Sequence, residues 1–522
     1  MPRRPPGGRT PPDPPTPGAG IAPGRQPPTS PGTAALRLPP VAWAGLATIA
    51  VALFATAMLV GTRYGYHRDE LYFMACGQRL AWGYVDQPPF TPAVARLASE
   101  VFGNSLPGLR VFPALAGVAV LVLLALLVRE LGGGRRAQLL AAGTAALIPL
   151  FHTPAMVLST TTFDLVVWGA CLVLAARMLR TGDDRLWLAI GAVAGVGLLN
   201  KHAVVFLVLG LVAGLLMSSK RSLLLRPTAL AGGVLALAIW APNLWWQARH
   251  GWPVFEMSEA LQAKNASALG ILLCLPGVLV LAGVTSVVIW GPGLWWLVRA
   301  RDAASFRALG GLALVVTVSM TFLGGKSYYL APVVFVLLAA GAIVIERQDA
   351  VLRRVAVAAA VAAGVFTLPF SVPILPADAL GPVISVNAEF GEMYGWPELT
   401  DQLADAYRRL APAERAHAVV LTANYGEHGA VVHYGGGRGL PEPYSGHNDL
   451  WWWGPPPATT TAVVAVGLPP ETLSQHFRSV EVVGFVTNPA GLDNEEAGQP
   501  IVLARGPLAG WDVIWPALRR YG

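Results

Sequence analysis

Long apolar runs recur from residue 41 to residue 370 and are separated by short polar connections. Many approach the roughly 17 to 25 residues that a helix needs to cross about 30 Å of hydrocarbon. The pattern predicts eleven membrane-spanning helices, over residues 41–61, 109–128, 137–151, 158–176, 186–199, 203–217, 228–246, 269–290, 308–323, 329–345 and 355–370.

Basic residues fall in every second connection between these runs, which is the distribution expected of cytoplasmic loops. With the N-terminus in the cytoplasm, an odd number of spans places the segment after residue 370 outside. The outer loops then hold the unusual polar and aromatic stretches, such as "YGYHRDELYF" and "GGKSYYLAP". The basic connections contain Arg129, Arg135, Arg136, Arg177, Arg180, Arg185, Lys220, Arg221, Arg226, Arg299, Arg301, Arg307, Arg347, Arg353 and Arg354.

Composition supports a multi-pass membrane protein, because 54% of the 522 residues are hydrophobic and only 13% are charged. Heavy use of Ala, Gly, Arg and Pro is typical of a GC-rich bacterial genome, so we predict a bacterial plasma membrane protein. The formal charge of +7 is uneven: residues 373–522 carry 8 arginines against 16 acidic residues, and the preceding residues are basic. The positive charge therefore belongs to the membrane part, and we predict no nucleic-acid partner. Three scattered cysteines favour neither disulfides nor a cysteine zinc site.

The two ends of the chain have different compositions. Residues 1–40 are rich in proline and poor in large apolar side chains, which predicts a disordered cytoplasmic tail. Residues 371–522 predict a small extracytoplasmic α/β domain, with a helix over 398–415 and strands in "HAVVLTA", "TAVVAVGL", "VEVVGFVT" and "PIVLA". Its aromatic loop "YSGHNDLWWWGPPP" fits either packing onto the membrane surface or sugar binding.

The first outer loop, residues 62–108, contains two acidic positions between aromatic residues. Asp69 and Glu70 stand in "HRDELYF", and Asp86 stands in "DQPPF", where two prolines stiffen the chain. The stretch "LYFMACGQRLAWG" predicts an amphipathic helix in the membrane interface, with Asp69 at its start. A structural role for Asp69, as a helix cap paired with Arg68 or Arg79, is the alternative.

Two fixed carboxylates beside a bilayer suit a general base and a partner that orients a metal ion or a phosphate. Three cations, Lys201, Arg249 and Lys326, are predicted at the same outer face, where they could stabilise a departing phosphate. Each taken alone also fits a lysine or arginine that anchors a helix end at the interface. His250 with Asp86 is a weak candidate for metal binding, because no H-x-x-H or H-E-x-x-H spacing accompanies it.

The stretch "HRDELYFMACGQRLAWGYVDQPPF" resembles the first outer loop of the GT-C membrane glycosyltransferases. The likeness is to the superfamily of dolichyl-phosphate-mannose protein mannosyltransferases and aminoarabinose transferase (ArnT). That family opens the loop with an acidic pair and closes it with an acidic-x-Pro-Pro motif. "GGKSYYLAP" resembles its Lys-x-x-Tyr-Leu-x-Pro segment, and the likeness covers roughly residues 41–345. Gln87 departs from the family, which often has Lys there, so the phosphate contact would come from elsewhere.

The resemblance implies inverting transfer of a sugar from a polyprenyl-phosphate donor to an acceptor at the outer face of the membrane. It implies that Asp69 activates the acceptor and that Asp86 lies by the donor phosphate or a divalent metal ion. The acceptor is left open between protein, lipid and cell-envelope glycan. The residues that we predict for the site are Asp69, Glu70 and Asp86 as catalytic, Arg68, Tyr72, Lys201, Arg249, Lys326 and Tyr329 as substrate-binding, and Asp86 with His250 as metal ligands.

Two other classes of protein compete with this interpretation. A polytopic transporter or lipid flippase also needs many spans, but it predicts inverted repeats and broken helices at the midplane. We find no clear internal repeat, and the ionisable groups gather at one face. A non-catalytic protein that binds cell-wall polymer through its outer domain is the third alternative.

Overall fold

The computed structural model describes residues 1–3, 7–8, 13, 38–265, 267–323 and 325–522. The predicted disordered tail, residues 1–40, lies mostly outside the described residues. Residues Pro39–Gly522 form one compact unit.

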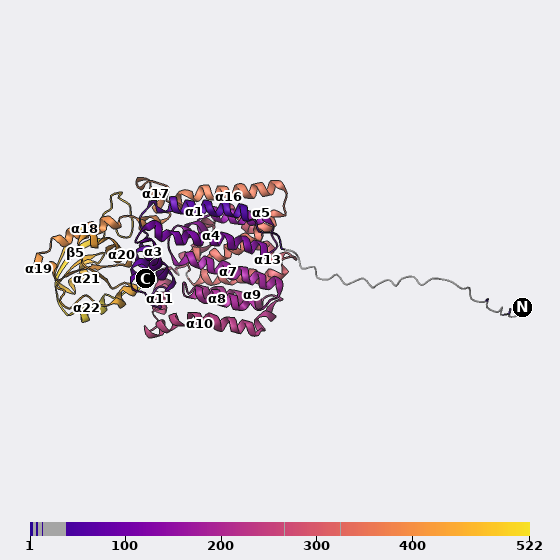
Figure 1. The fold of residues 1–522 in the computed structure, drawn as a ribbon, viewed down its shortest axis with the longest axis horizontal. Coiled ribbons are helices and arrows are strands. Elements are labelled where there is room, and N and C mark those ends of the chain that lie inside the picture. The colour runs from indigo at the N-terminus through magenta and orange to yellow at the C-terminus, as the bar shows by residue number, and fades with distance from the viewer. Residues whose placement is uncertain (4–6, 9–12, 14–37, 266, 324) are drawn as a thin grey trace. The chain divides into compact units, whose positions relative to one another are not determined.

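Twelve helices of the described chain correspond to the predicted spans. Most of them run roughly alongside one another (Figure 1). Seven helices in the described residues are long and apolar enough to cross a membrane. This confirms a polytopic helical membrane protein. The bundle consists of α1 (Trp43–Leu59), α4 (Leu106–Glu130), α5 (Arg135–Leu147), α7 (Thr160–Thr181), α8 (Leu186–Leu198), α9 (Val204–Leu216), α10 (Pro227–Arg249), α12 (Ala268–Leu281), α13 (Val287–Arg299), α14 (Arg307–Phe322), α15 (Ala331–Glu346) and α16 (Ala350–Ser371).

Each of the eleven predicted segments overlaps helix, but the segment 269–290 is not one straight span. It is divided between α12 and α13, which form a pair bent by 82°. Gly283 lies at the break with a φ of 68°, a left-handed conformation that glycine adopts without steric cost. Hydropathy alone does not detect this bend, because both arms are apolar.

Helix α15 lies inside the bundle and is buried along most of its length. It approaches α13 closely through two glycines, Gly293 and Gly341. A Cβ on Gly341 would lie 1.8 Å from the Ile289 carbonyl oxygen. Small residues at such contacts let two helix backbones pack against each other, as is common in membrane proteins.

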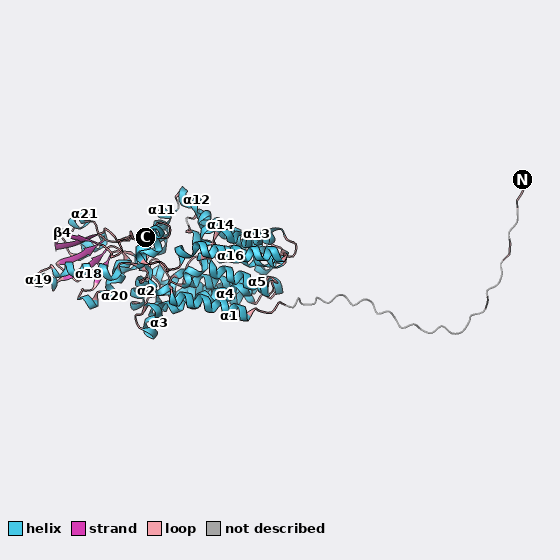
Figure 2. Cartoon of the chain, turned by 90° about the horizontal axis from the view of Figure 1, so that it is seen from above, coloured by secondary structure: helices cyan, strands magenta, loops and turns pink. Residues whose placement is uncertain are grey.

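The C-terminal domain is built on a five-stranded mixed sheet (Figure 2). The strand order is β2-β1-β3-β5-β4; β1 is parallel to β2 and β3, and β5 is antiparallel to β3 and β4. The strands are β1 (Ala418–Thr422), β2 (Pro443–Ser445), β3 (Ala462–Val466), β4 (Phe477–Phe485) and β5 (Pro500–Pro507), and the domain's main helices are α18 (Trp396–Arg408), α20 (Tyr425–Tyr434) and α22 (Trp511–Ala517).

The first outer loop forms two helices, α2 (Arg68–Gln78) and α3 (Phe90–Phe102). The helix predicted to lie in the membrane interface corresponds to α2, and the structure buries it against protein from Glu70 to Gly77. Helix α20 of the C-terminal domain packs directly on it, with Gly429 against Leu71. The amphipathic pattern of this helix therefore reflects burial against protein.

Helix α2 is anchored at its first turn by a buried ion pair between Glu70 and Arg110. Their exposed fractions are 0% and 1%, and two guanidinium nitrogens bond the carboxylate at 2.6 and 3.0 Å. Glu70 also accepts hydrogen bonds from the backbone N–H groups of His67 (2.9 Å) and Leu158 (3.0 Å). Arg110 in turn donates to the carbonyl oxygens of Gly61 and Gly65. One carboxylate thus ties the first outer loop to α4 and to the segment before α7.

Replacing Glu70 with Gln should destabilise the protein strongly. The substitution keeps the shape but leaves the Arg110 charge buried without a counter-charge, which costs about 3–5 kcal/mol. The control is Glu100→Gln, which breaks an exposed pair with Arg96 and should cost about 1 kcal/mol or less. Thermal or denaturant unfolding in detergent measures both variants, and equal losses would contradict the anchoring role.

The contact between α2 and α20 should not tolerate a larger side chain at Gly429. A Cβ there would lie 2.7 Å from the backbone carbon of Leu71, so Gly429→Ala forces the two helices apart and costs about 1–3 kcal/mol. Gly437→Ala is the control, because nothing lies within 4 Å of a Cβ at that position. If the unfolding temperature of Gly429→Ala matched that of the control, this packing would not be tight.

Candidate active site

A cavity of about 520 Å³ lies between the first outer loop and the C-terminal domain. Helix α11 (Pro253–Asn265) and the chain before α15 complete its walls. Carboxylates outnumber cations among the lining residues. The residues that line the cavity include His67, Arg68, Asp69, Asp86, Lys326, Glu389, Glu392, Asn424, Tyr425, Glu427, His447, Asn448, Gly467, Glu495 and Arg520.

The three parallel strands of the C-terminal sheet, β1, β2 and β3, have their carboxyl ends at this cavity. Asn424 follows β1, His447 follows β2 and Gly467 follows β3, and all three line it. Ligand sites of open α/β sheets characteristically lie outside the carboxyl ends of the parallel strands. The C-terminal domain is therefore built to contribute to the site.

Asp69 lines the cavity, and its carboxylate accepts a hydrogen bond from the Tyr425 hydroxyl at 2.8 Å. Its backbone N–H donates to His67 Nδ1, so His67, and not Asp69, is the N-cap of α2. The alternative of Asp69 as the helix cap is thus not what the structure shows. Arg79, the other residue of that alternative, pairs with Glu442 instead.

Asp86 lines the same cavity and receives two hydrogen bonds. The Tyr72 hydroxyl donates to one oxygen at 2.9 Å, and the Asn448 amide donates to the other at 3.3 Å. The pKa of Asp86 is raised to about 6, chiefly by burial and in smaller part by the nearby negative charge of Asp69. The two acids that the sequence singled out therefore face one cavity, as their spacing in the loop suggested. Tyr72 is almost fully buried and positions Asp86.

Arg68 is held in place by protein groups. Its Nη1 pairs with Glu392 at 3.3 Å and with Glu495, and its guanidinium lies over the Tyr425 ring, 4.7 Å from the ring centre. Because these contacts fix Tyr425, which donates to Asp69, Arg68 positions the acid. Its contacts do not point to a direct role in substrate binding.

Of the three predicted outer cations, Lys326 alone lines the cavity, where it is exposed. Lys201 bonds Thr161 at 3.0 Å and lies 4.4 Å from the ring centre of Tyr329, which it holds by a cation–π contact. Arg249 is exposed and stacks on Trp245. Lys201 and Arg249 therefore have the local contacts of helix-end anchors.

Glu70 does not line the cavity, although it is adjacent to Asp69 in the sequence. Both of its oxygens are occupied by Arg110 and by backbone N–H groups. We therefore assign it a structural role in holding the loop.

The predicted metal ligands do not come together as a group. Both oxygens of Asp86 accept hydrogen bonds from Tyr72 and Asn448. His250 Nδ1 lies 2.8 Å from the Trp246 carbonyl oxygen, and its ring stacks on Trp246. Since these residues do not fit a shared metal, no chemical step is assigned to a metal between them.

Several lining residues come from the C-terminal domain and were not predicted. Tyr425 and Glu427 stand in "ANYGE" directly after β1, and Asn448 stands in "SGHND" after β2. A signal was present, because polar residues directly after parallel strands mark the site edge of such sheets. To predict these residues from that signal, one must already know which strands are parallel.

Four buried carboxyl groups around the cavity have a pKa raised to about 6 or above, chiefly because burial disfavours their charged form. The pKa of Asp86 is about 6, that of Asp449 about 7, that of Glu427 about 8 and that of Glu496 about 7. Glu427 is fully buried, and its Oε1 has no hydrogen-bond partner in the described chain. These groups hold protons at a pH where unfolded carboxyl groups, with a pKa of about 4, have lost them.

The protein should therefore become more stable as the pH falls from about 8 to about 6. The folded chain binds more protons than the unfolded chain in this range, so stability is gained on acidification and lost as the pH rises. Glu427, with a pKa of about 8, should contribute on the order of 2 kcal/mol. Unfolding temperatures across this range measure the effect. Glu427→Gln should flatten the profile, and an unchanged slope would refute the assignment.

The sequence and the fold were compared with known proteins. Residues 86–246 match the family model described as dolichyl-phosphate-mannose-protein mannosyltransferase. The fold is similar to that of ArnT from Cupriavidus metallidurans bound to undecaprenyl phosphate, with 17% identity, a TM-score of 0.56 and coverage of 88% of this chain and 97% of that chain. The apo structure of the same enzyme gives 16% identity, a TM-score of 0.59 and coverage of 88% and 98%. No curated protein sequence matches significantly.

The family match begins at Asp86, the second acid of the cavity, and the shared fold spans both the helical bundle and the C-terminal domain. Taken together, they show that residues 86–246 are similar to this mannosyltransferase family and that the chain has a fold similar to that of ArnT.

Proposed function

We propose that this protein transfers a sugar from a polyprenyl-phosphate donor to an acceptor hydroxyl, with inversion at the anomeric carbon, on the outer side of a bacterial plasma membrane. The observation that carries the proposal is the cavity in which Asp69 and Asp86 meet, beside Lys326 and next to a bundle of apolar helices. The ArnT structure bound to undecaprenyl phosphate, which has a similar fold, supports a donor of this class.

Asp69 is the general base of the proposed reaction. Its carboxylate is half-buried, lines the cavity and accepts a hydrogen bond from the Tyr425 hydroxyl. It would take the proton of the acceptor O–H while that oxygen forms a bond to the anomeric carbon. The bond from this carbon to the phosphate oxygen breaks, and its electron pair leaves with the polyprenyl phosphate.

The leaving phosphate develops negative charge, which needs a positive group at the cavity mouth. Lys326 supplies it, because it lines the cavity and its side chain is exposed. Asp86, held by Tyr72 and Asn448, would bond the donor sugar or its phosphate, and with a pKa of about 6 it can donate a proton in weakly acidic solution. Fixed groups of this kind lower the barrier because they need no reorganisation during the reaction.

The Asp69→Asn variant tests the base. Loss of a general base should reduce transfer by about 100-fold or more, since the amide keeps the shape of the side chain but cannot take a proton. The measurement is sugar transfer from radiolabelled polyprenyl-phosphate sugars to cell-envelope acceptors in membranes carrying each variant.

Asp405→Asn is the matched control, because it makes the same chemical change at an exposed position of α18. It should transfer at the wild-type rate. If Asp69→Asn matched it, Asp69 would not be the base. If lipid translocation, and not transfer, depended on Asp69, the flippase alternative would replace the proposal.

A further inference from the structure

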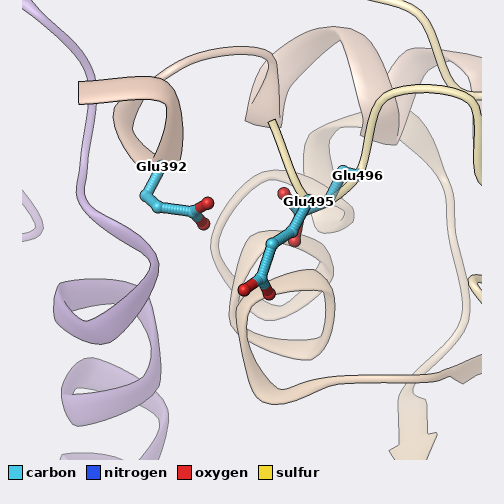
Figure 3. Close-up of side chains that lie close together, drawn as sticks. All are labelled: Glu392, Glu495 and Glu496. Atoms are coloured by element: carbon cyan, nitrogen blue, oxygen red, sulfur yellow. The ribbon is translucent and has the colours of Figure 1, made fainter. Parts of the chain in front are cut away.

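A second group of acids lies at the cavity wall away from Asp69 and Asp86. Glu392, Glu495 and Glu496 each offer a carboxylate oxygen, and these oxygens all lie within 4.8 Å of one another. Figure 3 shows the three side chains converging from two separate segments. Glu392 belongs to η8 (Ala388–Met393), which follows the last bundle helix, and the other two belong to the loop between β4 and β5.

The three carboxylates of this cluster are paired with fewer positive groups than there are carboxylates. Among the described residues, Arg68 forms ion pairs with the cluster. Its Nη1 contacts Glu392 and Glu495. Arg520 also faces this wall, but its Nη2 donates to the Ala423 carbonyl oxygen. One guanidinium in direct contact with the cluster leaves negative charge on its three carboxylates when all three are ionised. A divalent cation would balance it.

An unsatisfied buried oxygen points to the same conclusion. Glu496 is only 3% exposed, and its carboxylate points toward the cluster in Figure 3. Its Oε1 accepts a hydrogen bond from the Asn424 amide at 3.3 Å, whereas its Oε2 is buried and has no hydrogen-bond partner in the described chain. A buried carboxylate oxygen without a partner is costly and rare, and a bound cation would supply the missing contact.

We propose that Glu392, Glu495 and Glu496 bind a divalent cation, with calcium as the best fit. The donors are carboxylate oxygens, without histidine or cysteine, which favours hard cations over zinc. Two ligands of one Ca²⁺ lie up to about 4.6–5.2 Å apart, which is twice the usual Ca–O distance. The oxygens of the cluster lie within 4.8 Å of one another, and calcium accepts the flexible, all-oxygen coordination that such a set offers, whereas Mg²⁺ demands near-octahedral geometry at about 2.0–2.1 Å.

The cation would join two parts of the chain at the wall of the catalytic cavity. It would bridge the segment after α16 and the β4–β5 loop, and it would hold the carboxylates that pair with Arg68. Through Arg68 and Tyr425 it would act as a positioning element for Asp69. This site is separate from Asp86 and His250, neither of which belongs to the cluster.

Calcium binding to the full-length protein in detergent tests the proposal directly, without any assay of activity. After treatment with a chelator, titration with CaCl₂ should give saturable binding in calorimetry and a rise in unfolding temperature, at concentrations in the range of about 10⁻⁶ to 10⁻³ M that calcium sites span. MgCl₂ should bind at least tenfold more weakly. Absence of saturable calcium binding in this range would overturn the proposal.

Glu496→Gln and Glu495→Gln should each weaken calcium binding by at least tenfold, and the double variant should abolish it. Glu442→Gln is the control, because Glu442 is an exposed acid paired with Arg79 outside the cluster. Metal-free Glu496→Gln should unfold no lower than the metal-free wild type, since Gln removes a carboxyl group whose charged form is disfavoured by burial. This comparison separates a lost ligand from a misfolded protein. Unchanged calcium affinity in the double variant would also overturn the proposal.

Discussion

The active site depends on the buried ion pair between Glu70 and Arg110. Removing two charges from water is unfavourable unless both are paired and hydrogen-bonded throughout, and here the carboxylate receives bonds from Arg110 and from two backbone N–H groups. This arrangement fixes the first turn of α2. Successive residues of a helix point about 100° apart, so when Glu70 points into the protein, Asp69 is turned toward the cavity. The adjacent acids therefore have different positions: one holds the loop, and the other faces the cavity.

The cavity is shared between two parts of the chain that are far apart in the sequence. The first outer loop supplies Asp69 and Asp86, and the C-terminal domain supplies their hydrogen-bond donors, Tyr425 and Asn448. The Tyr425 ring lies between Arg68 and the Tyr72 and His447 rings. An acid whose orientation depends on such contacts cannot be positioned by the bundle alone. The C-terminal domain is therefore part of the candidate site.

Site residues that stand in one short stretch of the sequence were predictable. Residues whose role depends on a partner elsewhere in the fold were less so. The acids of the first loop were predictable, because two rigid carboxylate motifs in one outer loop of a membrane protein are unusual. The burial of α2 was not predictable, since an amphipathic helix has the same pattern against lipid headgroups as against another helix. Glu70 looked catalytic beside Asp69, and its partner, Arg110, lies 40 residues away in α4. The strands were mostly visible as apolar runs, but β2, with three residues, was too short to detect.

The distribution of charge in the cavity constrains how a substrate could lie in it. Lys326 is an exposed cation on the side of the helical bundle, and most of the carboxylates come from the C-terminal domain and the segment that leads into it. In the proposed reaction a lipid-linked phosphate would approach from the membrane, and Lys326 is the cavity cation that comes from the helical bundle. The acids farther from the bundle would repel a phosphate that entered more deeply, and this repulsion would hold the donor at the membrane side with its sugar directed at Asp69. The acceptor would then enter along the acidic wall, where hydroxyl groups find hydrogen-bond acceptors and where a bound cation would reduce the repulsion between the carboxylates.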